Sequence, residues 1–113
     1  MPRRVLVVED EAMVAMLIED LLTDLGCVLA GSVSTAEEAM RLAMAQEFDL
    51  ALLDVNLGDG ETSFEVADLL RERTVPFAFL TGYGSGGVRA DLRDAPILSK
   101  PVDPQELERL LKS

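Results

Sequence analysis

Polar residues capable of chemistry stand directly after several apolar runs of the sequence. Glu9 and Asp10 follow one run and Asp54 follows another, whereas Thr81 and Lys100 each follow a further run. Neighbouring carboxylates raise one another's pKa values unless a cation neutralises them, and Mg²⁺ or Mn²⁺ binds such oxygen ligands. A lysine ammonium and a threonine hydroxyl suit the oxygens of a phosphoryl group. If folding brings the five side chains together, Asp54 is the natural nucleophile for phosphoryl transfer and would form an acyl phosphate.

The strands that must position these residues are indicated by hydropathy. Five apolar runs have the length of strands, and continuous apolar character over about four residues suits a strand buried on both faces of a parallel sheet. The runs comprise residues 5–8, 27–30, 50–53, 77–80 and 96–98.

Helical patterns separate these runs, each marked by an apolar stripe or by a start or stop signal. They are a stripe from Val14 to Leu25 ended by Gly26, a capping-box pattern at Ser34–Glu37, the segment Phe64–Arg73, and a last helix with Asp103 as N-cap and Pro104 as first residue. Residues 82–96 differ, because four glycines within 82–87 disfavour a helix. We expect a loop there, followed at most by a short, frayed helix around residues 88–93.

Alternation of strands and helices predicts an α/β fold, a doubly wound five-stranded parallel sheet with helices on both faces. In such sheets ligands sit outside the carboxyl ends of the strands. The five polar side chains all follow strands, so we expect them to converge at that edge. The length of 113 residues and the lack of a repeat or linker predict a single domain over residues 1–113.

Composition excludes several function classes. The chain has no histidine, so it offers no His-based catalysis, His metal site or phosphohistidine, and its one cysteine cannot form an internal disulfide. A formal net charge of −11 argues against direct binding of nucleic acid or of an anionic membrane surface. No apolar run reaches the ~20 residues of a membrane span. These features predict a cytoplasmic globular protein.

Four motifs in order resemble the receiver domain of bacterial two-component response regulators, and the resemblance covers essentially the whole chain. They are Val7–Glu11, Leu52–Leu57, Leu80–Gly82 and Ser99–Pro101. The resemblance implies a flavodoxin-like strand order 2-1-3-4-5, and a phosphoryl group transferred to Asp54 from a phosphohistidine on a sensor histidine kinase. It also implies that a Mg²⁺ site is formed by Glu9, Asp10, Asp54 and the main-chain carbonyl of Asn56, and that Thr81 and Lys100 contact the phosphoryl group.

One position departs from the usual receiver pattern. Receivers usually carry Tyr or Phe three residues before the lysine, where this chain has Ile97, so the aromatic half of the usual switch is absent. The segment Pro76–Gly84 resembles the FAT GUY subgroup, with Leu80 where that motif has alanine. The subgroup often stands alone and works with kinases of the HWE/HisKA_2 type. Rearrangement of residues 82–95 would then carry the response, and Asn56 and Tyr83 flank the site where they could tune hydrolysis.

Simpler interpretations exist for each residue taken alone. Glu9 and Asp10 could merely begin a helix, and Asp54 could be a turn residue. A small Mg²⁺-dependent phosphatase with Asp54 as transient nucleophile is an alternative function, although Asn56 stands where such enzymes usually have a second acid. A pseudo-receiver that only binds partners is a further alternative. The glycines after Thr81 are not a phosphate-binding P-loop, because no Lys-Ser/Thr pair follows them.

The remaining expectations concern packing and partners. We expect Cys27 to be a small buried residue and the five methionines to pack mostly on helix faces, with Met13 and Met16 as possible partner contacts. No output domain is expected in this chain. The response would then pass through protein contacts, a phosphate sink or a relay to an unknown downstream protein, and the resemblance places the contact face around the last two strands and the final helix.

Overall fold

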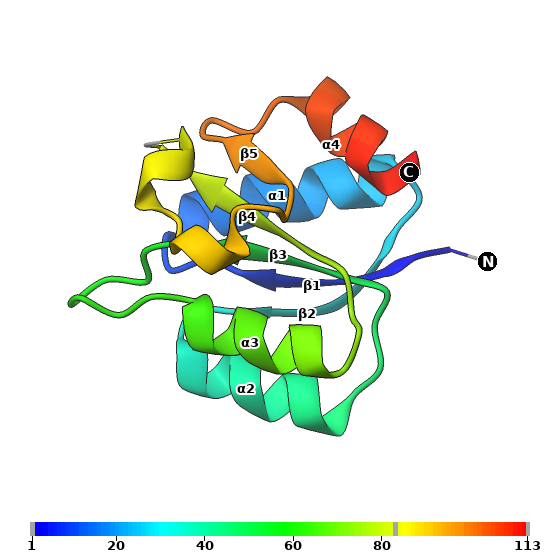
Figure 1. Cartoon of the computed structure of the whole chain (residues 1–113). Coiled ribbons are helices and arrows are strands. Elements are labelled where there is room, and N and C mark those ends of the chain that lie inside the picture. Colours follow the sequence, from blue (N-terminus) through cyan, green and yellow to red (C-terminus); the bar gives the residue numbers. More distant parts are fainter. Residues whose placement is uncertain (1, 83, 113) are drawn as a thin grey trace.

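Five parallel strands form one sheet in the order β2-β1-β3-β4-β5 (Figure 1). The computed structural model of the chain describes residues 2–82 and 84–112. The strands are β1 (Arg4–Val8), β2 (Val28–Val33), β3 (Leu50–Asp54), β4 (Phe77–Thr81) and β5 (Ile97–Ser99). This order confirms the doubly wound parallel sheet and the flavodoxin-like arrangement predicted from the sequence.

Four α-helices cover the two faces of the sheet (Figure 1). Helices α1 (Ala12–Asp24) and α4 (Pro104–Lys112) lie on one face, and α2 (Ala36–Ala45) and α3 (Phe64–Glu72) lie on the other. No helix among the described residues has the length and apolar character that a membrane span requires.

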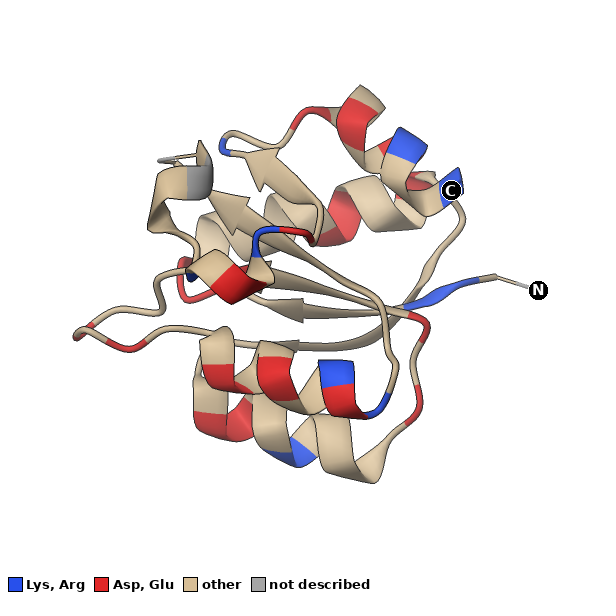
Figure 2. Ribbon diagram, viewed as in Figure 1, with Lys and Arg blue, Asp and Glu red and all other residues tan. Residues whose placement is uncertain are grey.

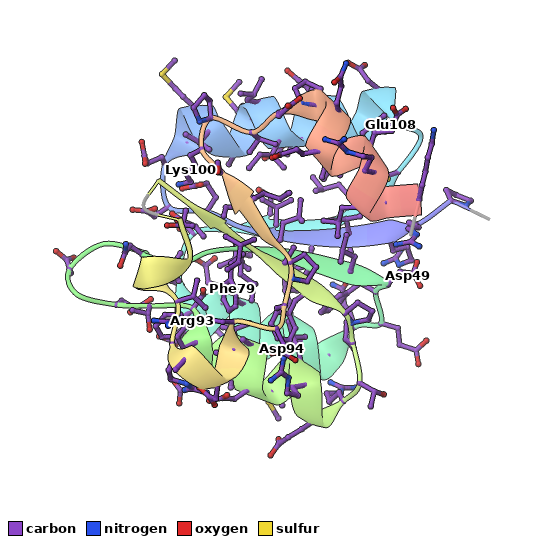
Figure 3. The ribbon with its side chains drawn as sticks, turned by 45° about the horizontal axis from the view of Figure 1, so that its top comes forward. Asp49, Phe79, Arg93, Asp94, Lys100 and Glu108 are labelled. Carbon is purple, nitrogen blue, oxygen red and sulfur yellow. The ribbon has the colours of Figure 1, made fainter. Side chains whose placement is uncertain are left out.

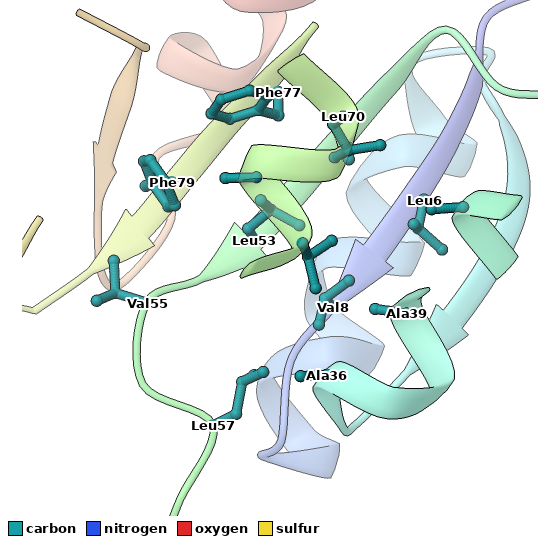
Figure 4. Close-up of a cluster of buried hydrophobic side chains, with 14 of the residues drawn as sticks. Leu6, Val8, Ala36, Ala39, Leu53, Val55, Leu57, Leu70, Phe77 and Phe79 are labelled. Atoms are coloured by element: carbon teal, nitrogen blue, oxygen red, sulfur yellow. The ribbon is translucent and has the colours of Figure 1, made fainter. Parts of the chain in front are cut away.

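The sheet separates two apolar cores. The larger one lies between the sheet and α2 and α3 (Figure 4), where the ring of Phe79 meets Phe64 and Phe77 edge-on at centroid distances of 5.9 and 5.6 Å. The smaller one lies beneath α1 and α4 and includes Ile18 and Leu107. Because both faces are covered, β1, β3 and β4 are almost wholly buried, as their continuous apolar runs predicted.

The expectation of burial on both faces is wrong for both edge strands. In β5 only Leu98 is buried, and the departure is larger in β2. This strand lies at the sheet edge, runs to Val33 rather than ending at Ala30, and leaves Val28 and Leu29 exposed. Hydropathy missed its second half because Gly31 and Ser32 are not apolar. A Cβ at Gly31 would lie only 2.7 Å from a terminal methyl carbon of Leu42, so a larger residue there would require this side chain to move. Cys27, just before the strand, is only partly buried.

The buried face of α1 also differs from the predicted stripe. Ala15, Ile18 and Leu22 are buried, whereas Leu17 is 46% exposed. The rest of the predicted stripe is confirmed, because Val14, Leu21 and Leu25 pack against the smaller core. Periodicity therefore gave the right face, missing Ala15 and including Leu17. The expectation that the methionines pack mostly on helix faces is wrong for Met13, Met16 and Met44, which are exposed. Met40 does pack against the larger core, and Met1 lies outside the described residues.

Local signals position the other helices. The cap of α2 is Thr35 rather than Ser34: its side-chain oxygen accepts from the Glu38 N–H, and its hydroxyl donates back to the Glu38 carboxylate. The capping pair is therefore Thr35 and Glu38, displaced by one residue from the predicted Ser34–Glu37. At α4 the Asp103 carboxylate accepts from the Gln105 N–H at 2.9 Å, as an N-cap does.

The segment between β4 and β5 contains no α-helix in its described part. It forms two short 3₁₀ turns, η1 (Gly84–Gly87) and η2 (Ala90–Leu92). Val88 and Leu92 are buried in the larger core, and the Arg89 guanidinium binds both Asp68 of α3 and Asp91. The expected loop and short helical turn are thus present, held against α3 by two apolar side chains and an ion pair.

Candidate functional site

The five polar residues singled out from the sequence all lie at the carboxyl edge of the sheet. Glu9 and Asp10 follow β1, Asp54 ends β3, Thr81 ends β4, and Lys100 follows β5. In Figure 3 Lys100 stands at one end of the sheet and Asp49, which precedes β3, stands at the other. Because β1 and β3 are neighbours and β4 and β5 follow in order, the parallel topology brings these residues together.

Lys100 is the cationic centre of the site. Its Nζ lies 2.7 Å from Glu9 Oε1, 3.2 Å from Asp54 Oδ1 and 3.9 Å from Glu11 Oε1. Burial lowers the pKa of Lys100, but its hydrogen bond to Glu9 and the charges of Asp54 and Glu9 raise the pKa above its ordinary value. Lys100 therefore stays protonated, and its ammonium group contacts the buried carboxyl groups of Glu9 and Asp54. The peptide bond from Lys100 to Pro101 is cis.

Asp54 carries the strongest electrostatic perturbation at this edge. Burial raises its pKa, hydrogen bonding with Glu9 and Asp10 and the charge of Glu9 raise it further, and Lys100 only partly opposes them, so the pKa is about 8. Without another cation this carboxyl holds a proton at neutral pH, because three acids share one lysine.

The three acids also fit a divalent cation. Glu9, Asp10 and Asp54 each present a carboxylate oxygen within 4.8 Å of the others. This all-oxygen set has two buried members, and oxygen is the donor type that Mg²⁺ and Mn²⁺ prefer. A bound cation would lower the raised pKa of Asp54, because its charge would stabilise the ionised carboxylate. The residues present therefore fit the metal that the sequence indicated.

Thr81, Asn56 and Gly82 complete the surroundings of Asp54. They line a hollow of about 460 Å³ together with Asp54, Asp10, Glu11, Gly58 and Lys100. Thr81 is buried, and its carbonyl accepts from the Lys100 N–H at 3.0 Å, which ties the ends of β4 and β5 together. Apart from its chain neighbours, no described residue has an atom within 4 Å of the place where a Cβ on Gly82 would stand. Tyr83 lies outside the described residues.

Two residues of the site were not identified from the sequence. Glu11 contributes a third carboxylate to Lys100, and Gly58 lines the hollow. The continuous acidic run Glu9–Glu11 is the sequence signal that could have identified Glu11 as a site residue. Nothing in composition or periodicity points to Gly58, because its role depends on the path of the loop after β3.

A larger hollow of about 720 Å³ lies at the opposite, amino edge of the sheet, lined among others by Arg3, Asp49, Arg71 and Phe77. It holds no group of three metal-ligating acids among the described residues. The larger hollow is therefore not where the sequence places phosphoryl chemistry.

Comparison with known proteins points to one family. The family model described as response regulator receiver domain matches residues 5–112. Among curated proteins, PdtaR of Mycobacterium tuberculosis is 28% identical over 110 residues, covering 97% of this chain and 54% of PdtaR. PhyR of Methylorubrum extorquens is 31% identical over 114 residues, covering 98% of this chain and 43% of PhyR. The chain thus spans about half the length of these curated relatives.

A solved structure of similar length is the solution structure of SdrG from Sphingomonas melonis Fr1. It is 38% identical, with a TM-score of 0.87, and the match covers 98% of this chain and 94% of SdrG. A further structure describes the BeF3-activated conformation of SdrG, with a TM-score of 0.83 and coverage of 96% of this chain and 92% of SdrG. These matches agree with the fold described above.

Proposed function

The chain belongs to the response regulator receiver domain family, and from this membership and the geometry around Asp54 we propose that it is a phosphorylation-controlled signalling module whose phosphoacceptor is Asp54. One observation carries the proposal. The Asp54 carboxylate borders an open hollow, 3.2 Å from a protonated lysine and beside two further acids. We take residues 1–113 as one such domain.

The proposed reaction is an in-line displacement. An Asp54 carboxylate oxygen forms a bond to phosphorus while the bond from phosphorus to the donor's nitrogen or oxygen breaks, and the donor leaves with that electron pair. Lys100 then turns from Asp54 to an oxygen of the acyl phosphate, and the Thr81 hydroxyl donates to another. Later a water oxygen forms a bond to phosphorus, the bond from phosphorus to the Asp54 oxygen breaks, inorganic phosphate leaves and the carboxylate is restored. The domain thus catalyses its own phosphorylation and dephosphorylation rather than the turnover of an external substrate.

A divalent cation, Mg²⁺ or Mn²⁺, would be held by Glu9, Asp10, Asp54 and the main-chain carbonyl of Asn56. It would supply positive charge next to the transferring phosphoryl group and relieve the repulsion among the three carboxylates. The protein's own contribution is to fix these oxygens at and just beyond the ends of two neighbouring strands, and to keep the Lys100 ammonium within 3.2 Å of Asp54 and 2.7 Å of Glu9.

The response to phosphorylation would pass through residues 84–95. This segment follows Thr81 closely along the chain, and it is held by the buried Val88 and Leu92 and by ion pairs to α3. Ile97 replaces the aromatic residue of the usual switch, so a shift of this segment is the mechanism we favour. Assignment to the FAT GUY subgroup, and to kinases of the HWE/HisKA_2 type, belongs to this proposal.

The proposed phosphodonor is a sensor histidine kinase in the cytoplasm, a reducing compartment with which the single free cysteine, Cys27, is consistent. Met13 and Met16 are 84% and 62% exposed at the start of α1, directly beyond the acidic cluster. Exposed methionines adapt to partner surfaces, so we assign these two side chains to the kinase contact. The downstream partner is a protein, since the chain has 21 acidic and only 10 basic residues, whose positions along the ribbon Figure 2 marks, and this balance disfavours nucleic acid.

Mass spectrometry tests the proposal directly. With Mg²⁺ and acetyl phosphate, the wild-type protein should gain one phosphoryl group, and Asp54→Asn should gain none. Asp59→Asn is the matched control, because it removes a carboxylate from the next loop at a positive φ of 51° that asparagine tolerates. Full labelling of Asp54→Asn at the wild-type rate, or no labelling of the wild type, would reject the assignment of Asp54.

A further inference from the structure

The loop between β3 and α3 folds back on itself into a small arch, residues 56–62, that projects from the carboxyl edge of the sheet (Figure 1). Asn56 and Thr62 pair across it as an isolated antiparallel bridge, and the Leu57 N–H donates to the Glu61 carbonyl at 2.8 Å. Gly58, Asp59 and Gly60 turn the chain with φ values of 85°, 51° and 76°. The arch therefore has two arms, one leading from Asp54 and the other entering α3.

The inner arm of the arch is a wall of the acidic site. Asn56 and Gly58 both line the hollow beside Asp54. A Cβ built on Gly58 would lie 3.4 Å from Asp10 Oδ2, so the backbone passes in near contact with this carboxylate. A small displacement of the inner arm would therefore change the space between Asn56 and Asp10, where the proposed cation would bind.

The outer arm is fastened to a different helix. Glu61 Oε1 accepts a hydrogen bond of 2.8 Å from the N–H of Ala36, the first residue of α2. The Thr35 cap satisfies the Glu38 N–H, so Glu61 supplies an acceptor that the cap does not provide, and its charge suits the positive end of the helix. Among the hydrogen bonds between described residues, those of residues 56–62 otherwise stay within the arch.

We propose that Glu61 is a positioning residue for the divalent cation. By binding the amino end of α2 it fixes the outer arm, and through the Asn56–Thr62 bridge it holds the inner arm beside Asp10 and Asp54. Glu61 does not touch the site: it is one of the outer supports on which the geometry of a metal site depends. The inference rests on the proposed function, because it assumes that the acidic cluster binds Mg²⁺.

Two measurements on three variants test the inference. Glu61→Ala removes the acceptor, and Glu61→Gln keeps an acceptor without the charge. Glu65→Ala is the control: Glu65 lines one surface hollow together with Glu61, but its side chain makes none of the hydrogen bonds found between described residues. Amide exchange of the metal-free protein reports on the arch, and calorimetric titration with Mg²⁺ alone reports on the site. In Glu61→Ala the amides of Ala36 and Leu57 should exchange faster, and the Kd for Mg²⁺ should rise about tenfold.

The conservative and control variants should separate positioning from charge. Glu61→Gln should keep the wild-type exchange at Leu57 and a Kd near that of the wild type, and Glu65→Ala should match the wild type in both measurements. Unchanged exchange at Leu57 in Glu61→Ala, or faster exchange there with an unchanged Kd, would overturn the role of Glu61 alone. A wild-type protein that binds no Mg²⁺ would instead overturn the proposed function, and the inference with it.

Discussion

Lys100 Nζ lies 2.7 Å from an oxygen of Glu9, whose side chain is fully buried, while the lysine side chain itself is 18% exposed. A buried carboxylate without a partner is strongly unfavourable, so the ion pair with Lys100 is what allows Glu9 to be buried next to Asp54. One ammonium cannot neutralise Glu9, Asp10 and Asp54 together. The site is therefore built with an excess of negative charge that a further cation can relieve.

Replacing Lys100 should destabilise the metal-free protein. Lys100→Ala leaves Glu9 buried without its partner, and we expect the free energy of unfolding in urea to fall by about 2 kcal/mol at neutral pH. Saturating Mg²⁺ should recover much of this loss, because it supplies positive charge to the same carboxylates. Lys112→Ala is the control, since the exposed Lys112–Glu108 pair contributes less than about 1 kcal/mol. Equal losses in the two variants would contradict this account of the site.

The stability of the metal-free protein should fall as pH rises toward 8. The pKa of Asp54 is raised from 3.8 to about 8 in the folded state, so the folded protein binds a proton that the unfolded chain has already lost. The contribution of the protonated carboxyl is fully present below about pH 4 and is lost as pH rises through the folded-state pKa. Asp54→Asn cannot ionise, so its thermal midpoint in chelator should exceed that of the wild type by roughly 5 °C at about pH 8.

Two further conditions check this pH dependence. At about pH 4 the advantage of Asp54→Asn should become small, because the wild-type carboxyl is then protonated in the folded state and close to half protonated in the unfolded chain. With Mg²⁺ at about pH 8 the advantage should shrink or reverse, because the ionised carboxylate becomes a ligand. A constant difference between the two proteins across this range would show that Asp54 does not titrate as described.

Hydropathy and order along the chain were sufficient to predict the sheet and the gathering of residues at its carboxyl edge. Glu9, Asp54 and Lys100 each follow an apolar run, and parallel strands end at one edge, so few alternatives remained. Periodicity could not predict that Leu17 faces solvent or that β2 extends through Gly31, because both depend on which elements become the edge of the fold. The support from Glu61 to α2 joins residues 25 positions apart and carries no local pattern at all.

Apolar burial, rather than the ion pair, should hold residues 84–95 in place. Leu92 is buried against the larger core, so Leu92→Ala should lower the free energy of unfolding by about 3 kcal/mol. The Arg89–Asp68 pair is 40% and 48% exposed in its side chains, so Asp68→Asn should cost less than about 1 kcal/mol. Amide exchange of residues 88–95 should nevertheless rise in both variants. A cost for Asp68→Asn that equals that of Leu92→Ala would assign the docking to the ion pair instead.

Ser63 should be replaceable with a gain in stability. Its hydroxyl is fully buried where the arch enters α3 and has no hydrogen-bond partner among the described residues, although its main-chain N–H donates to the Val55 carbonyl. A buried hydroxyl without a partner costs about 1–3 kcal/mol, and alanine removes it while keeping the backbone contacts. Ser63 stands at the N-cap position of α3, but its side chain makes no cap hydrogen bond there, so none is lost. Ser63→Ala should therefore raise the free energy of unfolding by about 1 kcal/mol. Thr35→Ala is the opposing control, because the Thr35 side chain caps α2 and its loss should cost about 1 kcal/mol. Destabilisation by Ser63→Ala would mean that the hydroxyl is satisfied by a bound water and supports the arch.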